Sequence, residues 1–368
     1  MGRLAHLRLR HFRNYRALDL EVTPGLTAFV GANGQGKTNL LEAIHYLSLL
    51  RSFRTRRIRD LRQWDASFLF VEGALASASS AFDCHKLTVT YATTRRLRLD
   101  GKVVAKASDF INQLICIAFV PEDIELVKGG PAVRRRFIDV LLCQRDRHYL
   151  THLMRYTLAL KSRNVMLREV GRYDARVLAA YDPVLAASGS YMIGARRDLG
   201  RELNVQLAQL AEELFGGKTE VRLRYRSCLG RQQGSEDDLA AQLVELFEQE
   251  QPRDREQGYT RLGPHRDEMF ILLNNRPAGV YGSEGQCRLL SLALRLASVE
   301  ILAQAQPDRE LILLVDDVLG ELDSERRGCF LRTFARADQT FMACTEVPDR
   351  LGQAPTSLFG VEDGTLRS

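Results

Sequence analysis

Residues 31–38 constrain the fold of this chain more than any other stretch. Their sequence, GANGQGKT, matches the phosphate-binding pattern G-x-x-x-x-G-K-[ST] in full. Alternating apolar residues precede it as in a short strand, and apolar residues at helical spacing follow it. In this order, strand, loop and helix direct backbone N–H groups and a helix N-terminus at bound phosphate. The residues predicted to bind nucleotide here are Gly31, Ala32, Asn33, Gly34, Gln35, Gly36, Lys37 and Thr38.

Two side chains of this loop have individual predicted roles. Lys37 would bridge the β- and γ-phosphates of a nucleoside triphosphate such as ATP, and the hydroxyl of Thr38 would hold Mg²⁺. The competing interpretation is a chance glycine-rich turn. The strand before the loop and the amphipathic helix after it favour the phosphate-binding interpretation.

An acidic pair follows the most apolar run of the chain. Residues 311–315, LILLV, have the pattern of a fully buried parallel strand, and Asp316 and Asp317 come directly after them. Such an acid is the magnesium-binding partner of a phosphate loop, so Asp316 would bind the metal directly or through water. Asp317 would orient and polarise the attacking water as the catalytic base. The alternative, a simple strand-end cap, is less favoured because the same chain carries the phosphate loop.

A second phosphate-binding device is predicted at residues 281–286, YGSEGQ, where a helix begins. Ser283, Gly285 and Gln286 would offer a hydroxyl group, free N–H groups and the positive end of the helix dipole. One nucleotide does not need two helix termini from distant segments of one subunit. We therefore expect this turn to cap ATP held by a second copy of the chain, in a two-fold dimer. The alternative is an N-capped helix without a ligand.

Composition indicates a globular protein with an uneven distribution of basic residues. The chain has 368 residues, 45% of them hydrophobic, and a formal net charge of +6, with a pI near 9.0. Arginines cluster in residues 1–16, 51–62 and 134–136, a distribution that suits either a nucleic-acid-binding face or solvated helix surface. The arginines that we predict to contact DNA are Arg54, Arg56, Arg57, Arg134 and Arg135.

Cysteine usage and hydropathy indicate the compartment. The chain has seven cysteines but no C-x-x-C pair, which is typical of buried thiols in a reducing environment. Its start is charged from Arg3 onward and lacks the apolar segment of a signal peptide. No apolar run approaches the roughly 20 residues that span a bilayer. We expect a cytoplasmic protein with no membrane partner.

The pattern along the chain predicts an α/β fold with an insertion. Residues 1–121 and 258–368 read as strand-rich and would form the nucleotide-binding domain, whereas residues 122–257 read as helical and would form an inserted lobe. Asp100-Gly101 predicts the turn of a hairpin. Pro183 is expected to break or kink a helix of the lobe. The helical stripes do not form a sustained heptad repeat, which argues against a long coiled coil.

Several motifs together resemble a known family. The phosphate loop, residues 283–286, the acid pair and LGELD at residues 319–323 resemble the phosphate loop, signature, Walker B and D-loop of an ABC-type ATPase. HFRNY at residues 11–15 resembles the SMC-like branch of these ATPases. With RSFR at 51–54, residues 121–139 and GPHRD at 263–267, the whole chain resembles the RecF family of bacterial recombination mediators.

The resemblance implies an SMC-like ABC ATPase fold and an ATP- and Mg²⁺-dependent, DNA-binding homodimer with weak, DNA-stimulated ATPase activity. It implies binding to duplex DNA and to single-strand/double-strand gap junctions. It also implies cooperation with RecO and RecR, which helps RecA to replace the single-strand-binding protein, and roles in DNA replication, DNA repair and SOS induction. By the same resemblance, Arg13 would contact the nucleotide phosphates and Asp323 would reach across the dimer.

Some positions depart from the ABC pattern or remain open. Asp317 stands where many ABC ATPases have Glu, and Thr345 or Glu346 stands where transporters place a switch histidine. Gln63 is either a metal-contacting Q-loop residue or an exposed loop glutamine. His265 either contacts the nucleotide or partner, or caps the turn in which it lies.

Two other functions share the nucleotide motifs. The ATPase subunit of a transporter does not need the long helical insertion or the arginine clusters. A structural chromosome protein of the SMC type needs long coiled-coil arms, for which this sequence lacks heptads.

Overall fold

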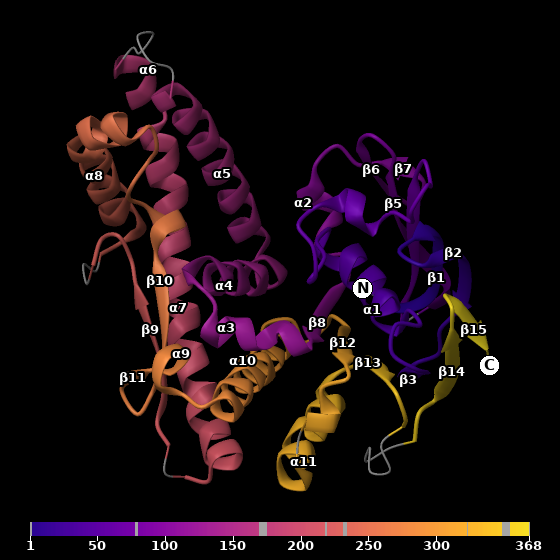
Figure 1. Ribbon diagram of the computed structural model, residues 1–368. Helices are drawn as coiled ribbons and strands as arrows, with labels where there is room; N and C mark the ends of the chain where they lie inside the picture. Colours follow the sequence, from indigo (N-terminus) through magenta and orange to yellow (C-terminus); the bar gives the residue numbers. More distant parts are fainter. Residues whose placement is uncertain are drawn as a thin grey trace. The chain divides into compact units, whose positions relative to one another are not determined.

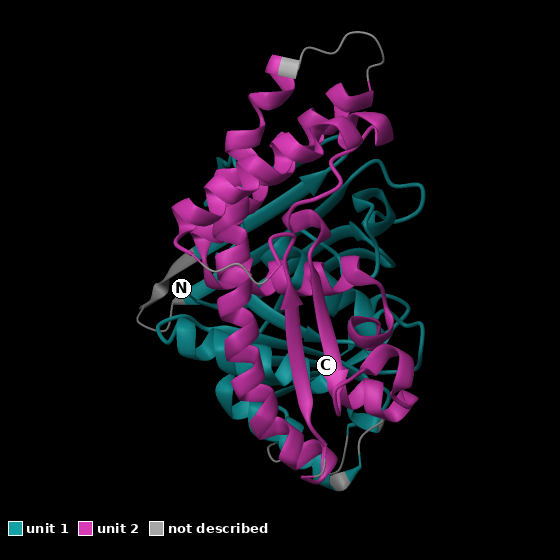
Figure 2. Cartoon of the chain, turned by 90° about the vertical axis from the view of Figure 1, so that its left-hand side faces the viewer, with its two compact units in different colours: residues 1–123, 292–368 teal, residues 124–291 magenta. Residues whose placement is uncertain are grey.

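The computed structural model describes residues 2–77, 80–168, 175–217, 219–230, 234–321, 323–347 and 354–367. Its contacts divide the chain into two compact units (Figures 1 and 2). Unit 1 comprises residues 1–123 and 292–368, and unit 2 comprises residues 124–291. Helix α10 (Glu284–Ala305) begins in unit 2 and continues into unit 1.

The first sheet of unit 1 is antiparallel, and strand β3 leaves it for the second sheet. The order of the first sheet is β2-β1-β4-β5-β6-β7 among the described residues. Leu9 pairs with Leu18 and Leu7 with Leu20, and all four side chains are buried. The Asp100-Gly101 turn is confirmed, with both residues at positive φ. The strands are β1 (Arg3–Phe12), β2 (Tyr15–Glu21), β4 (Leu69–Ser77), β5 (Ser80–Tyr91), β6 (Arg95–Leu99) and β7 (Lys102–Val103).

The second sheet of unit 1 carries the phosphate loop and the acidic pair. Within the described residues its order is β15-β14-β3-β13-β12-β8, and its strands are parallel except for β15. The residues predicted as a buried parallel strand form β12, which lies between two neighbours and is buried throughout. The strands are β3 (Gly25–Val30), β8 (Ile115–Phe119), β12 (Leu311–Asp316), β13 (Gln339–Cys344), β14 (Ser357–Glu362) and β15 (Thr365–Arg367).

Helix α1 (Lys37–Leu49) lies between these two sheets and joins them into one core. Its Leu40, Ile44 and Leu47 have no exposed surface and pack in a cluster with side chains of both sheets. Burying a side chain of this size contributes about 2 kcal/mol each. The phosphate loop therefore runs from a central strand into a helix that is buried on most sides, which fixes its two ends.

Short elements complete unit 1. They follow helix α1 and strands β7, β8 and β12 along the chain and carry several of the polar residues discussed below. They are η1 (Ile58–Leu61), α2 (Ala107–Phe110), η2 (Pro121–Ile124), η4 (Leu319–Glu321), α11 (Ser324–Arg332) and η5 (Thr333–Arg336). Residue 322, in the stretch that resembles a D-loop, lies outside the described residues.

Unit 2 is mainly helical. Its longest helix, α7, begins at Asp182 with Pro183 in its first turn and ends at Gly216, which has φ 74°. The predicted break at Pro183 is therefore confirmed and no kink forms: α6 ends at Ala179, and the proline suits the start of α7, where the missing N–H group costs nothing. The helices are α3 (Glu125–Lys128), α4 (Pro131–Arg145), α5 (Arg147–Arg168), α6 (Ala175–Ala179), α7 (Asp182–Phe215), α8 (Glu236–Gln257), η3 (Pro264–Arg266) and α9 (Ala278–Tyr281).

Unit 2 also contains a small antiparallel sheet, with β10 (Glu268–Leu273) between β9 (Val221–Arg226) and β11 (Arg276–Pro277). We expected the inserted lobe to cover residues 122–257, but unit 2 continues to residue 291. The reason lies in the pairing of β10 with β9, from Glu268 opposite Arg226 to Leu273 opposite Val221. This pairing keeps the segment after residue 257 with the lobe.

Candidate nucleotide site

The phosphate loop has the backbone shape that its glycines predict. Gly34 and Gly36 have φ angles of 83° and 115°, a region that L side chains rarely adopt. Within the described part of the chain, the N–H groups of Gly34, Gln35 and Gly36 have no hydrogen-bond partner. These groups lie directly before the first turn of α1, so the loop offers several donors and a helix dipole to one anion.

Lys37 is folded back onto the loop itself. Its Nζ donates to the carbonyl oxygens of Gly31 at 2.7 Å and Ala32 at 2.9 Å, and the residue is 6% exposed. These carbonyl groups hold the ammonium group within the loop, where it could also contact a bound phosphate. A bound phosphate oxygen offers the same group a charged acceptor, which forms a stronger hydrogen bond than a neutral carbonyl.

Thr38 and Asp316 meet although 278 residues separate them in sequence. The Thr38 hydroxyl donates to Asp316 Oδ1 at 2.8 Å. Burial raises the pKa of Asp316 to about 6, while the Thr38 hydrogen bond opposes that shift and the charges of Glu122 and Asp317 add to it. A buried carboxylate beside a hydroxyl group is a set of hard oxygen donors suited to Mg²⁺. The described residues contain no cluster of three His, Cys, Asp or Glu side chains, which a magnesium ion shared with phosphates does not require.

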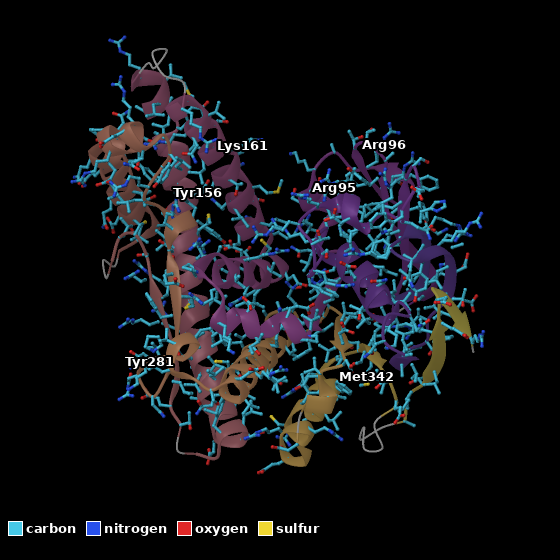
Figure 3. The ribbon with its side chains drawn as sticks, in the orientation of Figure 1. Arg95, Arg96, Tyr156, Lys161, Tyr281 and Met342 are labelled. Carbon is cyan, nitrogen blue, oxygen red and sulfur yellow. The ribbon has the colours of Figure 1, made fainter. Side chains whose placement is uncertain are left out.

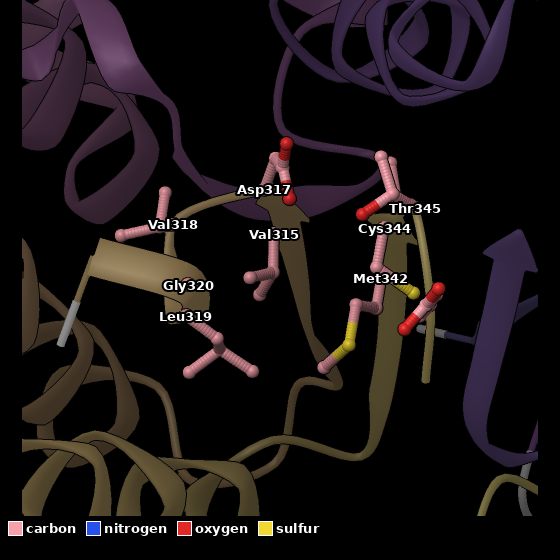
Figure 4. A pocket seen from close by; sticks show the side chains of 10 residues that line it. Val315, Asp317, Val318, Leu319, Gly320, Met342, Cys344 and Thr345 are labelled. Carbon is pink, nitrogen blue, oxygen red and sulfur yellow. The ribbon is translucent and has the colours of Figure 1, made fainter. Parts of the chain in front are cut away.

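Asp317 directly follows the same strand and has a strained conformation. Its φ is 51°, in the left-handed region, and its N–H donates to the carbonyl of Ala343 on β13 at 3.0 Å. Non-glycine residues held in this region cluster at functional sites. Beside Asp317 lies a pocket of about 90 Å³, lined by Val315, residues 317–320 and residues 342–346. In Figure 4, Asp317 and Thr345 lie at its rim, whereas Leu319 and Met342 line its apolar part.

Two segments that the sequence did not indicate form hydrogen bonds to the phosphate loop at Gln35. The Asn14 side chain donates to the carbonyl of Gln35 at 2.9 Å. The turn between β14 and β15 approaches the same residue, with Gly364 N–H donating to the Gln35 carbonyl at 3.0 Å. A Cβ atom on Gly36 would come within 2.5 Å of Asn14. Asn14 lies in the HFRNY motif, whereas the terminal turn carried a hairpin signal in Asp363-Gly364.

Arg13 is held by an internal acid. Its Nε and Nη2 atoms donate to the two carboxylate oxygens of Glu42 at 2.7 Å each, and its Nη1 donates to the carbonyl of Asp60 at 2.8 Å. Glu42 lies on α1, has no exposed surface and also accepts from the hydroxyl of Ser52. The predicted contact of Arg13 with nucleotide phosphates stays a prediction, and this structure engages the guanidinium group elsewhere.

The turn at residues 281–286 is exposed and well formed. Ser283 Oγ accepts from the N–H of Gln286 at 3.2 Å, and Gln286 Oε1 accepts from the N–H of Ser283 at 2.9 Å. These reciprocal bonds form a capping box at the start of α10. Gly285 is exposed with open space at its Cβ position. Tyr281, labelled in Figure 3, is 66% exposed and Val280 is 75% exposed.

Asp323 and the residues at the switch position lie on the surface of unit 1. Asp323 caps α11 by accepting from the N–H of Arg326 at 2.9 Å, and it pairs with the guanidinium group of Arg326 at 2.7 Å. Thr345 and Glu346 are exposed and line the pocket beside Asp317. Asp323, Thr345 and Glu346 are therefore exposed on the surface, where a partner can contact them.

The predicted DNA-contacting arginines divide into two groups. Arg54, Arg56 and Arg57 are exposed on the loop before η1, where Arg54 Nη1 also donates to Asn39 Oδ1 at 3.0 Å. Arg134 instead forms a largely buried ion pair with Glu268, its Nε lying 2.9 Å from Oε1. Arg135 donates to the carbonyl of Asp267 at 2.8 Å. The guanidinium groups of Arg134 and Arg135 therefore have partners inside unit 2, which argues against their predicted contact with DNA phosphates.

The two residues with open interpretations have internal partners. Both ring nitrogens of His265 are used: Nδ1 lies 2.7 Å from Tyr156 Oη, and Nε2 lies 3.0 Å from the carbonyl of Thr260. Burial lowers the pKa of His265 to about 4, so its ring is neutral and fastens its turn. Gln63 Oε1 lies 3.1 Å from His11 Nδ1, a contact that fits a loop role.

No helix among the described residues has both the length and the apolar character that crossing a bilayer demands.

Comparison with known proteins agrees with this geometry. The family model described as RecF/RecN/SMC N terminal domain matches residues 3–362. The DNA replication and repair protein RecF of Latilactobacillus sakei subsp. sakei is 36% identical, with 99% of this chain and 98% of that protein covered. That of Streptococcus suis is 37% identical over the same shares. A solved structure of the recombination mediator protein RecF with ATP in the RecFOR pathway superimposes with a TM-score of 0.90 at 28% identity, covering 99% of this chain and 96% of that one. The chain therefore belongs to the RecF family and has the SMC-like ABC ATPase fold.

Proposed function

We propose that this protein is an ATP-dependent DNA-binding protein of recombinational repair that closes as a dimer around ATP. The observation that carries the proposal is the 2.8 Å contact between Thr38 and Asp316, which unites the phosphate loop and the buried acid. Relatives named DNA replication and repair protein RecF, and a RecF structure solved with ATP, support it.

Nucleotide binding would use groups that are already in place. The free N–H groups of residues 34–36 would donate hydrogen bonds to phosphate oxygens. Lys37 would donate to the β- and γ-phosphates in place of its two carbonyl acceptors. Thr38 and Asp316 would hold Mg²⁺, which neutralises phosphate charge when bound. Ionisation of Asp316 is unfavourable in its buried site, so a nearby cation would relieve that cost.

Dimer closure would use the exposed turn at residues 281–286 on unit 2. Its Ser283 hydroxyl and helix N-terminus would approach the γ-phosphate bound by the partner copy, as inferred from the sequence. The exposed apolar side chains of Val280 and Tyr281 give this turn a surface that a partner would cover. Asp323 would lie at the same interface, where Arg326 is its present partner.

Hydrolysis would open the dimer. Asp317 would orient the attacking water from its exposed position directly after β12, where its φ of 51° marks a strained backbone. Asp has one methylene group fewer than the Glu of many ABC ATPases, so we expect slow turnover that DNA stimulates. A fast ATPase that ignores DNA would contradict this part of the proposal.

Binding to DNA would be led by phosphate contacts, at duplexes and at gap junctions, with the exposed Arg54, Arg56 and Arg57 as candidate contacts. Action with RecO and RecR would then help RecA to replace the single-strand-binding protein. This activity would place the protein in the cytoplasm, with roles in DNA replication and SOS induction.

Sedimentation of the full chain with ATP, with ADP and without nucleotide tests the dimer. We expect association with ATP alone, and a monomer for Ser283→Arg, which still binds ATP. Ser235→Arg is a matched control, because Ser235 forms the same kind of capping box at the start of α8, on another part of unit 2. ATP-driven association of Ser283→Arg at the wild-type level would contradict the proposed geometry.

A further inference from the structure

Strand β9 displays a row of three arginines on one side. In its sequence VRLRYR, Val221 and Leu223 are buried, whereas the intervening Arg222, Arg224 and Arg226 are exposed. We call these three residues the arginine ladder. Because successive side chains of a strand point to opposite faces, the ladder occupies one face and the buried residues occupy the other.

The buried face of β9 packs on α7. A Cβ atom on Gly200 of α7 would lie 3.6 Å from the methyl group of Met269 and 4.0 Å from Cβ of Tyr225, on the face opposite the ladder. Figure 1 shows β9 and β10 side by side next to α7. The helix therefore anchors the strand and leaves the arginines on the side that faces away from it.

One aromatic ring organises two of the arginines. Phe270 pairs directly with Arg224 in the register of β9 and β10, so the two side chains share the ladder face. The guanidinium carbons of Arg224 and Arg226 lie 5.2 Å and 4.8 Å from the centroid of this ring. Cation–π attraction of about 0.5–1 kcal/mol at such exposed sites holds both cations near one ring.

The ladder lacks acidic partners. Within the described residues, none of its three members forms an ion pair. The carboxylate on the same face, that of Glu268, is committed to Arg134. Three exposed cations therefore lie in a row without neutralisation, which produces a positive field along the strand.

The free edge of β9 is closed to a further strand. The side-chain amide of Asn204 on α7 donates to the carbonyl of Leu223 at 2.9 Å and accepts from its N–H at 2.7 Å. An extended peptide that joins a sheet needs these backbone groups. A partner would thus meet the arginine side chains rather than the backbone of β9.

We infer that the arginine ladder binds the sugar–phosphate backbone of one DNA strand, as a second contact surface on unit 2. Arginines at alternate positions of a strand repeat every ~6.7 Å, close to the distance between successive phosphates of an extended nucleic-acid strand. Arginine also matches phosphate oxygens with paired donors. The inference rests on the proposed DNA-binding function and adds to it the surface that takes the backbone.

The ladder reads backbone rather than bases. Bases stack most favourably on the open face of an aromatic ring, and the ring of Phe270 already has two guanidinium groups beside it. The surface therefore contributes affinity that depends on salt and not on sequence. An acidic protein segment is the rival occupant, and Asn204 prevents it from adding to β9 as a further strand at Leu223.

The test compares two triple variants of the full chain with equal loss of charge. The ladder variant is Arg222→Gln, Arg224→Gln and Arg226→Gln. The control variant is Arg147→Gln, Arg201→Gln and Arg253→Gln, which removes exposed arginines from helices of the same unit. Fluorescence anisotropy measures the binding of duplex and single-stranded oligonucleotides across salt concentrations with ATP and Mg²⁺. Sedimentation measures ATP-driven association in parallel.

We expect the ladder variant alone to lose about tenfold or more in DNA affinity. Its plot of log affinity against log salt concentration should be shallower by about 2 to 3, since each lost phosphate contact removes about 0.9. ATP-driven association should be unchanged in both variants. Failure of the proposed function would look different, because the wild type itself would then not bind DNA. Equal DNA affinity of the ladder and control variants would overturn the inference.

A second measurement keeps the inference testable if the triple variant folds poorly. Phenylglyoxal modifies exposed arginines of the wild-type protein, and mass spectrometry locates the modified residues. DNA should protect Arg222, Arg224 and Arg226 but leave Arg201 and Arg253 reactive. Protection by a poly-glutamate peptide without protection by DNA would overturn the inference and assign the surface to an acidic protein.

Discussion

The backbone N–H of Asp363 donates a hydrogen bond to Gln35 Oε1 at 2.7 Å, which ties the C-terminal hairpin to the phosphate loop across 328 residues. Gly364 N–H and the Asn14 side chain add bonds to the carbonyl of the same glutamine. Gln35 is thus held through its side chain and its backbone together. A loop fixed in this way does not need to order itself when phosphate binds, which favours tight binding.

Gly364→Val should loosen this anchorage and weaken ATP binding by about tenfold. The glycine has φ 72°, and a Cβ atom there would come within 2.6 Å of the carbonyl oxygen of Asn14. Gly101→Val is the matched control, since Gly101 has φ 78° in another hairpin turn with open space around it. Titration with a fluorescent ATP analogue measures the affinity of each variant. Equal affinities would refute the anchoring role.

Asp316→Asn should stabilise the protein without nucleotide at neutral and basic pH. The folded-state pKa of about 6 lies above the unfolded value of 3.8, so ionised Asp316 destabilises the fold above pH 6, and this cost disappears as pH falls towards 4. We expect a gain of about 3 kcal/mol at pH 8, because the pKa rises from 3.8 to about 6 and each pKa unit corresponds to about 1.4 kcal/mol. Thermal unfolding between pH 4 and pH 8 measures it. A variant at an exposed acid, Asp308→Asn, should show no such gain.

His265 should make the fold sensitive to acid. Burial lowers the pKa of His265 from 6.5 to about 4. The neutral ring therefore contributes fully to the stability of the fold above pH 6.5, and this contribution is lost as pH falls from 6.5 to about 4. His265→Gln should reduce this pH-dependent loss of stability by about 3 kcal/mol, since each pKa unit corresponds to about 1.4 kcal/mol. The surface variant His148→Gln should keep the wild-type slope of stability against pH. Identical pH profiles for the wild type and His265→Gln would contradict the assignment.

Arg163→Met should destabilise unit 2 by about 3–5 kcal/mol. Arg163 has no exposed surface, and its guanidinium group lies 3.0 Å from Asp182 and 2.7 Å from Asp254. Its removal leaves two buried carboxylates without a counter-charge. Arg201→Met removes an exposed arginine and should cost less than about 1 kcal/mol. Denaturant unfolding measures the stability of both variants. Similar losses of stability would argue against a stabilising role for the buried ion pairs of Arg163.

Local patterns were sufficient for the phosphate loop and the strand that ends in Asp316. The glycines at positive φ, the apolar run and the helical spacing act over a few residues, where backbone sterics and side-chain periodicity decide the structure. The turn at Asp100-Gly101 followed from the same kind of signal. The assembled motifs are by themselves sufficient to indicate the RecF family.

Contacts between distant segments decided the rest. The sequence does not show that Arg134 and Arg135 are used inside unit 2 while the arginines of β9 are exposed. Whether an arginine is buried depends on which acid the fold brings beside it, here Glu268, more than 130 residues away. The fastening of Gln35 by the terminal hairpin has the same origin. Local sequence determines the shape of the phosphate loop, but tertiary packing determines which charges and donors remain free to act, because desolvation and pairing arise only where remote segments meet.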